Sequence, residues 1–246
     1  MPDHYEKFPL KTPEEYRLEE EDLVENPETR TPIIICVDCS YSMLQHRRLA
    51  KVMEGLKTFC HDMSKNPIAR QSVELCIISY GGESARVEKD FTPPDRMVLP
   101  ELTANGATPL ADAVKTAMEN LDMRKQRYED NGVNNFRPWL ILIGDGDETQ
   151  SSKELDEAAA LLKAESDAKH LNVLCVAVGD EERMEFASLM KLSPDNRVQY
   201  LRDMKFDEFF GWLSRSIEKT SQSMSGEEVF YEPIRTWGEE LRGEQE

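Results

Sequence analysis

The sequence predicts an α/β fold: a three-layer, doubly wound and mostly parallel sheet of six strands with helices on both faces. Continuous apolar runs, such as residues 32–37 (PIIICV) and 139–143 (WLILI), are typical of strands that are covered on both faces. Stretches with apolar residues at helical spacing separate most of these runs, as in residues 47–65. The short Gly81-Gly82 connection predicts one hairpin, and with it one antiparallel pair.

Six strands are expected in chain order, at residues 32–37, 73–80, 84–91, 139–143, 172–178 and 198–201. The third run is the most polar, which favours a position at an edge of the sheet. Helices are expected at residues 47–65, 109–128, 152–169, 181–192 and 205–223. Because strands and helices alternate along the chain, the helices should cover a sheet that is mainly parallel.

Charge divides the chain into three segments. Its 246 residues include 48 acidic and 30 basic side chains, a formal charge of −18, and both ends are more acidic than the middle. We therefore expect an acidic extension at residues 1–30, one domain at residues 31–225 and an acidic tail at residues 226–246. The tail also carries Phe230, Tyr231, Trp237 and Leu241, which suggests that it packs on this chain or on a partner.

Composition argues against several classes of protein. A pI near 4.7 argues against binding to nucleic acid, which depends largely on Lys and Arg. No apolar run is long enough for a membrane helix, and the first 30 residues do not resemble a signal peptide, so we expect a cytoplasmic protein with no membrane partner. The five cysteines show no metal-ligand spacing and are expected to be free thiols.

Oxygen-bearing side chains follow two of the predicted strands and precede a helix. Asp38, Ser40 and Ser42 come directly after the first strand, Thr108 precedes the helix at residue 109, and Asp145 follows the strand at residues 139–143. Loops at the carboxyl ends of parallel strands meet at one edge of the sheet. Hydroxyl and carboxylate oxygens suit Mg²⁺, and Mn²⁺ or Ca²⁺ would also be accepted. These residues therefore predict a site for a divalent cation.

Each element of this pattern has a simpler interpretation. Asp38, Ser40 and Ser42 alone could form a capped turn, because Asp and Ser accept hydrogen bonds from backbone amides. Their occurrence together with Thr108 and Asp145 favours the metal site. Asp147 and Glu148 are interpreted as solvated acids of the same loop, with a supporting role beside the cation as the alternative.

The three motifs together resemble the metal-ion-dependent adhesion site of von Willebrand factor A domains, which combines D-x-S-x-S, a threonine before a helix and an aspartate after a later strand. The resemblance implies that Ser40, Ser42 and Thr108 ligate the cation directly, and that Asp38 and Asp145 hold it directly or through water. A partner's carboxylate would complete the coordination. This chain departs from many members in having Tyr41 in place of Gly and Gly144 in place of Thr.

Further segments resemble the TerY-like branch of cytoplasmic bacterial A domains, which is associated with tellurite resistance and other stress responses. They are the RPWLILIGDG segment, the following AVG and the residues from Leu201 to Ser223. Members of this branch are often encoded near a serine/threonine kinase and a protein phosphatase, which implies a role in a signalling or stress-response assembly.

These expectations combine into one leading function. We expect a non-enzymatic, Mg²⁺-dependent module that captures a carboxylate of a protein partner. One alternative is a metal-dependent phosphoryl-transfer enzyme with Asp38 as nucleophile, although Ser40 stands where such enzymes carry a second acid. Another is a subunit that couples to a chaperone-like ATPase.

Overall fold

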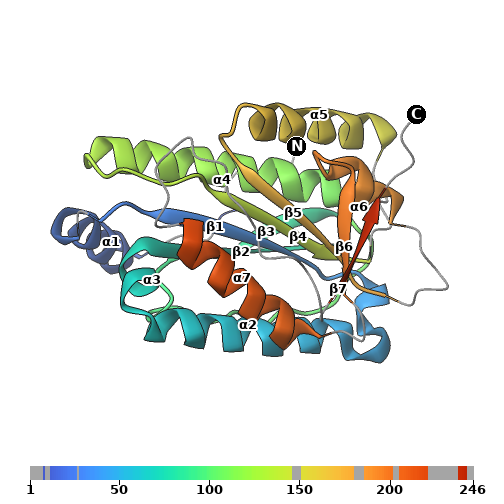
Figure 1. The fold of residues 1–246 in the computed structure, drawn as a ribbon, viewed down its shortest axis with the longest axis horizontal. Coiled ribbons are helices and arrows are strands. Elements are labelled where there is room, and N and C mark those ends of the chain that lie inside the picture. Colours follow the sequence, from blue (N-terminus) through green and yellow to red (C-terminus); the bar gives the residue numbers. More distant parts are fainter. Residues whose placement is uncertain are drawn as a thin grey trace.

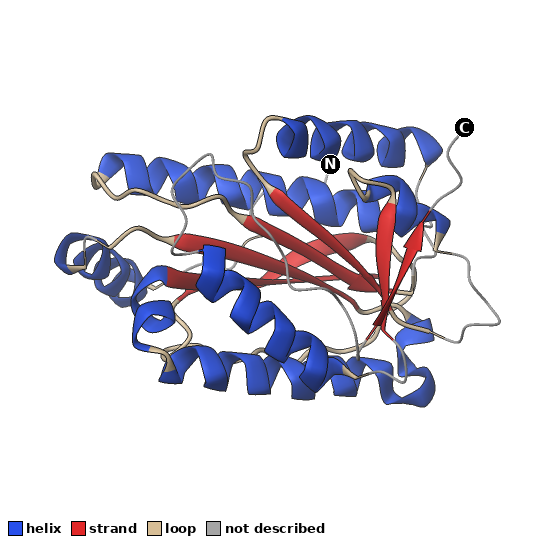
Figure 2. Ribbon diagram, viewed as in Figure 1, coloured by secondary structure: helices blue, strands red, loops and turns tan. Residues whose placement is uncertain are grey.

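A seven-stranded mixed sheet forms the centre of the protein (Figures 1 and 2). The computed structural model describes residue 8 and residues 12–26, 28–145, 151–179, 186–201, 205–220 and 238–242. The strand order across the sheet is β3-β2-β1-β4-β5-β6-β7. The strands are β1 (Thr31–Asp38), β2 (Val73–Gly81), β3 (Ser84–Thr92), β4 (Trp139–Gly144), β5 (Asn172–Ala177), β6 (Arg197–Leu201) and β7 (Gly238–Arg242).

The helices lie on both sides of this sheet and at one of its ends (Figure 1). They are α1 (Pro13–Glu25), the 3-10 helix η2 (Tyr41–Arg47), α2 (Arg48–Lys65), α3 (Pro67–Ser72), α4 (Leu110–Asp130), α5 (Ser152–Asp167), α6 (Ala187–Leu192) and α7 (Phe206–Thr220). Within the described residues, no helix has both the length and the apolar character needed to cross a membrane.

Alternate side chains of the central strands supply two separate cores. Ile33, Ile35 and Val37 of β1 pack with α2 and α7 on one face, whereas Ile34 and Cys36 pack with α4, α5 and α6 on the other. All eight residues of β1 are buried, which explains why the strand is an uninterrupted apolar run. The predicted three-layer α/β class is thereby confirmed.

The six predicted strands are all present, and the structure adds a seventh. β2 and β3 form the expected antiparallel hairpin, with β3 at the edge. The added strand, β7, lies in the acidic tail and pairs antiparallel with β6. Its Leu241 packs against the core on the α4 side, so this part of the tail packs on its own chain. Phe230, Tyr231 and Trp237 lie outside the described residues.

The structure also contains helices that the sequence analysis did not predict. These are α1, η2 and α3. The predicted helix at 181–192 is described only from Ala187 onward, and α7 begins at Phe206 with its aromatic side chains buried, as expected. All five cysteines are buried free thiols, which agrees with the expected absence of disulfides.

Acidic side chains of α1 pair with arginines of the domain. Glu19 is bound by Arg124 and Arg127, and Asp22 by Arg30 and Arg96. Part of the negative charge of the first 30 residues is therefore neutralised within the molecule.

Candidate functional site

The register of β1 brings two of the predicted loops together. Asp38, the last residue of β1, pairs with Tyr80 of β2, and its neighbour Val37 pairs with Ile143 of β4. Asp38 therefore lies beside the end of β4, where Asp145 follows. Both carboxylates lie at the carboxyl edge of the sheet, where an α/β fold commonly places its ligand site.

The first loop is organised by its own polar groups. Oδ1 of Asp38 accepts a hydrogen bond from the backbone N–H of Ser40 at 2.7 Å. The hydroxyls of Ser40 and Ser42 lie 2.8 Å apart and are hydrogen-bonded to each other. Three oxygen-bearing side chains thus share one turn, as the D-x-S-x-S spacing predicts. Ser40 does not cap η2 through its side chain, so helix capping does not account for its hydroxyl.

Backbone hydrogen bonds hold the Thr108 loop against the first loop. The N–H of Asn105 donates to the carbonyl of Cys39 at 2.6 Å, and the N–H of Tyr41 donates to the carbonyl of Gly106 at 3.3 Å. The next residue in the loop, Ala107, accepts from Gly82 at 3.0 Å. Thr108 is buried two residues before α4. The loop that carries Thr108 therefore lies beside Cys39 and Tyr41, within the D-x-S-x-S turn.

The two acids lie close enough to affect one another. Asp38 is fully buried, and burial together with the charge of Asp145 raises the pKa of Asp38 to about 7. Two carboxylates in such a place repel each other when both are ionised. A cation between them would remove that repulsion and favour the ionised form of both.

Each acid also keeps one oxygen without a partner. Among the described residues, Oδ2 of Asp38 and Oδ1 of Asp145 are buried and accept no hydrogen bond. Unpaired buried carboxylate oxygens are costly and rare. Together with three hydroxyl residues in the adjoining loops, they fit a hard divalent cation that keeps water in its remaining positions.

The candidate metal-binding side chains include two carboxylates and three hydroxyls, so they carry little formal charge. The described residues contain no group of three or more His, Cys, Asp and Glu arranged to hold a metal. A hydroxyl-rich site needs no such group. Direct ligation of a cation therefore stays a prediction, which rests on the placement of five residues at this edge of the sheet: Ser40, Ser42, Thr108, Asp38 and Asp145. Asp147 and Glu148 lie outside the described residues.

Two further residues belong to the site although the sequence analysis did not single them out. Arg48, at the start of α2, places its Nη1 3.6 Å from Oδ2 of Asp145. Tyr80 is buried beside Asp38, and its hydroxyl donates to the carbonyl of Ile143 at 2.9 Å. The signal for Arg48 was its position as a cation where a helix begins. Tyr80 gave no signal, because it ends an apolar strand.

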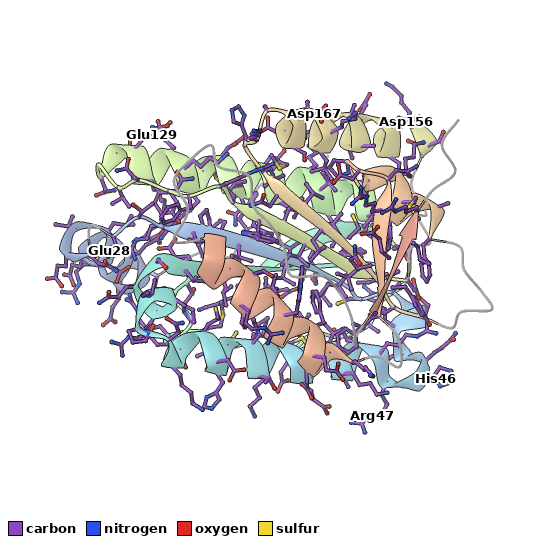
Figure 3. All side chains as sticks on the ribbon, in the orientation of Figure 1. Glu28, His46, Arg47, Glu129, Asp156 and Asp167 are labelled. Carbon is purple, nitrogen blue, oxygen red and sulfur yellow. The ribbon has the colours of Figure 1, made fainter. Side chains whose placement is uncertain are left out.

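The surface around the site exposes apolar side chains. Tyr41 and Leu44 of η2 are each 61% exposed. His46 and Arg47, at the end of η2, project outward at the same end of the molecule, opposite the end that bears Glu28 and Glu129 (Figure 3). A partner that reaches the site would therefore meet an apolar as well as a polar surface.

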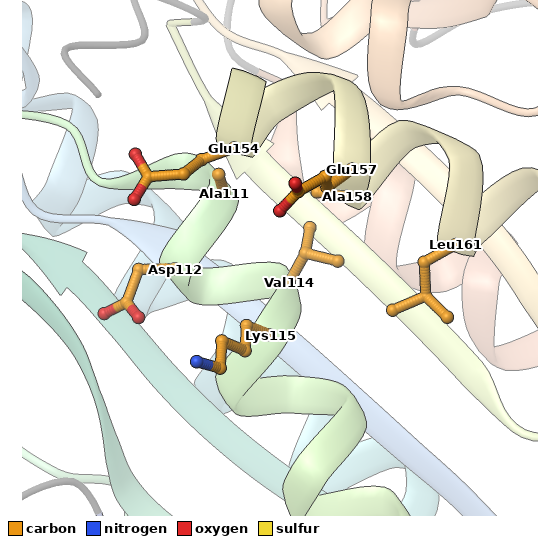
Figure 4. Close-up of a pocket in the computed structure, with 8 residues that line it drawn as sticks. All are labelled: Ala111, Asp112, Val114, Lys115, Glu154, Glu157, Ala158 and Leu161. Atoms are coloured by element: carbon orange, nitrogen blue, oxygen red, sulfur yellow. The ribbon is translucent and has the colours of Figure 1, made fainter. Parts of the chain in front are cut away.

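A separate cavity of about 290 Å³ lies between α4 and α5 (Figure 4). Its walls combine apolar and charged side chains of both helices: Ala111, Asp112, Val114, Lys115, Glu154, Glu157, Ala158 and Leu161. None of the five predicted metal ligands lines it. The site at the sheet edge and this cavity are thus distinct features.

Several solved structures are similar to this chain. The von Willebrand factor domain of a type V pilus tip protein from Porphyromonas gingivalis aligns with a TM-score of 0.58 at 10% identity, over 80% of this chain and 98% of that chain. The pilus adhesin SpaC from Lactobacillus rhamnosus GG, in its open conformation, aligns with a TM-score of 0.57 at 13% identity, over 79% of this chain and 31% of that one.

Proximal thread matrix protein 1 from the mussel byssus aligns with a TM-score of 0.51 at 14% identity, over 78% of this chain and 48% of that one. The chain therefore spans about half the length of the mussel protein and about a third of the adhesin. At these identities the likeness shows the fold. No relative was found among curated protein sequences.

A family profile gives the assignment that these structures alone do not. The profile of the von Willebrand factor type A domain matches residues 33–211, which is most of the chain and includes all five predicted ligands. The matched segment begins in β1 and ends in α7. This chain belongs to the von Willebrand factor type A domain family.

Proposed function

We propose that this protein is a non-enzymatic interaction module that binds a divalent cation, Mg²⁺ in the first instance, and uses it to capture a carboxylate of a protein partner. The observation that carries the proposal is the pair of buried carboxylate oxygens without a partner, Oδ2 of Asp38 and Oδ1 of Asp145. When bound, the cation would supply a positive charge with an open coordination position. Ser40, Ser42 and Thr108 would hold it without adding negative charge.

The neutral ligands matter for this function. A cation that is held by many carboxylates has little positive charge left to attract another acid. Hydroxyl ligands are neutral, so most of the cation's positive charge remains. The buried position of Asp38 also keeps bulk water from screening the site. The exposed side chains of Tyr41 and Leu44 would then contact apolar groups that flank the partner's carboxylate.

The wider role is proposed on the resemblance of sequence segments alone. In this proposal the module belongs to the TerY-like branch and acts in the cytoplasm, within a stress-response or signalling assembly that includes a serine/threonine kinase and a protein phosphatase. The pilus adhesin and the pilus tip protein among the similar structures represent a different use of the same fold.

Metal binding is the first test of the proposal. Titration of the full chain with Mg²⁺, Mn²⁺ and Ca²⁺, followed by calorimetry and thermal unfolding, should show one site per chain and a higher melting temperature that EDTA reverses. Asp38→Ala and Ser42→Ala should abolish or weaken binding. Asp62→Ala and Ser64→Ala, on the remote end of α2, are matched controls that should bind as the wild type does.

Capture of a partner is the second test. Affinity purification from the native cell, with Mg²⁺ or with EDTA, should yield proteins that are held only when the metal is present and are lost with Ser42→Ala. Retention of the same proteins in EDTA would contradict the proposal. Mg²⁺-dependent hydrolysis of a phosphoester that disappears in Asp38→Asn would instead support the phosphoryl-transfer alternative.

A further inference from the structure

A buried arginine connects two of the loops that form the candidate site. Arg48 is the first residue of α2, and only 6% of its side chain is exposed. Its Nη1 lies 3.6 Å from Oδ2 of Asp145 and donates to the carbonyl of Ser42 at 3.5 Å. One guanidinium thus contacts both the D-x-S-x-S turn and the aspartate that follows β4.

Two local features disfavour an arginine at residue 48, and a third shows strain in the backbone just before it. Burial of a guanidinium costs free energy unless it is paired. A cation at the beginning of a helix is repelled by the positive end of the helix dipole. The two preceding residues, His46 and Arg47, both adopt left-handed backbone conformations, with φ of 51° and 57°, which strain residues other than glycine. Violations of several local rules within three successive residues are typical of functional sites.

The two carboxylate oxygens of Asp145 have different surroundings. Oδ2 faces Arg48, whereas Oδ1 is buried without a hydrogen-bond partner among the described residues. Arg48 therefore pairs with one oxygen of the carboxylate and leaves the other available. Asp38, the other acid of the pair, also has one available oxygen, Oδ2.

The charge of Arg48 has opposite effects before and after a cation binds. In the metal-free protein it attracts Asp145 and reduces the repulsion between the two acids. With a divalent cation at the site, it lies near a like charge and opposes binding. The same positive charge adds to the attraction for a third carboxylate, that of a partner. Each of these effects follows from the single positive charge of Arg48, and its direction does not depend on other acids nearby.

We propose that Arg48 is a positioning residue that acts as the internal counter-ion of the metal-free site, so that it lowers the affinity for the cation and strengthens the capture of a carboxylate. This inference rests on the proposed function. It adds to that function a residue that sets the balance between metal affinity and partner affinity.

The test compares the wild type with Arg48→Met in the full chain. Calorimetric titration with Mg²⁺ and Mn²⁺ should give a Kd about three- to tenfold lower for R48M, because a nearby positive charge is gone. The metal-free R48M should melt at a lower temperature than the metal-free wild type. A change with a purely structural effect would weaken metal binding, so the sign of the change in Kd separates the two.

Acetate serves as the probe for carboxylate capture. Because linkage is reciprocal, a carboxylate that binds the loaded site must lower the Kd for the metal. Replacing chloride with acetate at constant ionic strength should lower the Kd of the wild type for the metal. The Kd of R48M for the metal should fall by a smaller factor.

Arg47→Asn is the matched control. Arg47 is the adjacent arginine, its side chain is 78% exposed beside Glu54, and asparagine tolerates a left-handed backbone. R47N should bind metal as the wild type does. If R48M does not fold, Arg48→Gln should show the tighter binding and Arg48→Lys, which keeps the charge, should stay near the wild-type Kd.

The outcomes separate this inference from the function on which it rests. An equal or higher Kd in the neutral variants, with metal binding intact in the wild type, would overturn the role of Arg48 alone. Failure of the wild type and the variants to bind either metal would overturn the proposed function and this inference together.

Discussion

Gly144 lies so close to Tyr80 that a Cβ atom on it would overlap the Tyr80 hydroxyl and lie 2.8 Å from Oδ2 of Asp38. Burial raises the pKa of Tyr80 well above its ordinary value, so the hydroxyl stays protonated and donates to the carbonyl of Ile143. The tyrosine thus occupies the space that a side chain at residue 144 would need. This explains why residue 144 is glycine in this chain.

A side chain at residue 144 should therefore destabilise the protein. We expect Gly144→Ala to lower the free energy of unfolding by about 2 kcal/mol, as overpacking typically does. The cost should be smaller in a Tyr80→Phe background, with a coupling of about 1 kcal/mol in a double-mutant cycle measured by urea unfolding.

Gly211→Ala, in the middle of α7, is the matched control. A Cβ there meets only the end of Arg215 at 3.6 Å, so alanine should stabilise the helix by about 0.5–1 kcal/mol. Equal effects of Gly144→Ala in both backgrounds would show that Tyr80 does not set the restriction.

The stability of the metal-free protein should fall as pH rises from about 4 to about 7. The folded pKa of Asp38 is raised to about 7 by burial and by Asp145, while an unfolded aspartate titrates at about 4. Between these values the folded state binds more protons than the unfolded state, so stability is highest below the unfolded pKa and is lost through this range. The slope from this group is about 1.4 kcal/mol per pH unit at most.

Urea unfolding at several pH values in EDTA would measure the total slope, and Asp38→Asn should lower it by the share of Asp38. A second share remains, because burial also raises the pKa of Glu74 to about 7. Because the cation must displace the proton, the apparent affinity for Mg²⁺ should rise over the same range. A slope that is unchanged in Asp38→Asn would assign the pH dependence to other groups.

The sequence was sufficient for the central sheet because burial on both faces gives an unmistakable pattern. The run from Pro32 to Val37 has apolar residues at every position, and the structure buries every one. The placement of Asp38, Ser40 and Ser42 could also be predicted, since it follows from where that strand ends.

The sequence could not reveal features that depend on distant contacts. β7 is a polar strand, GEELR, that is ordered by pairing with β6 rather than by its own apolar pattern. α1 has few apolar residues and docks through its acids. The contact between Arg48 and Asp145 joins residues nearly a hundred positions apart. None of these leaves a periodic signal in the chain.

The acids of α1 should contribute strongly to stability. Glu74 is fully buried and receives two hydrogen bonds from Arg124, at 2.6 and 2.8 Å, while Arg30 lies 4.0 Å away. Two buried guanidiniums thus share one buried carboxylate, and Glu19 and Asp22 of α1 supply the further negative charge. We expect Glu19→Gln with Asp22→Asn to cost about 3–5 kcal/mol in unfolding free energy, as for other broken buried pairs.

Glu21→Gln in the same helix tests whether this cost is specific. Glu21 is half exposed and pairs with Arg17 at 3.8 Å, so its loss should change the unfolding free energy by less than about 0.5 kcal/mol. If the double variant were as stable as Glu21→Gln, α1 would be a solvated extension rather than part of the folded domain.

β7 should protect β6 from exchange and from association with other chains. β6 pairs with β7 along its whole length, Arg197–Leu201, but with β5 only at Gln199 and Tyr200. A chain that ends at residue 237 would leave this edge open, whereas one that ends at residue 242 keeps β7. We expect faster amide hydrogen exchange in β6 only in the shorter chain, because the amides of an unpaired strand edge exchange with water. The shorter chain should also self-associate more, as measured by light scattering, because an unpaired edge pairs with strands of other chains. Equal protection of β6 in the two truncated chains would show that β7 is dispensable.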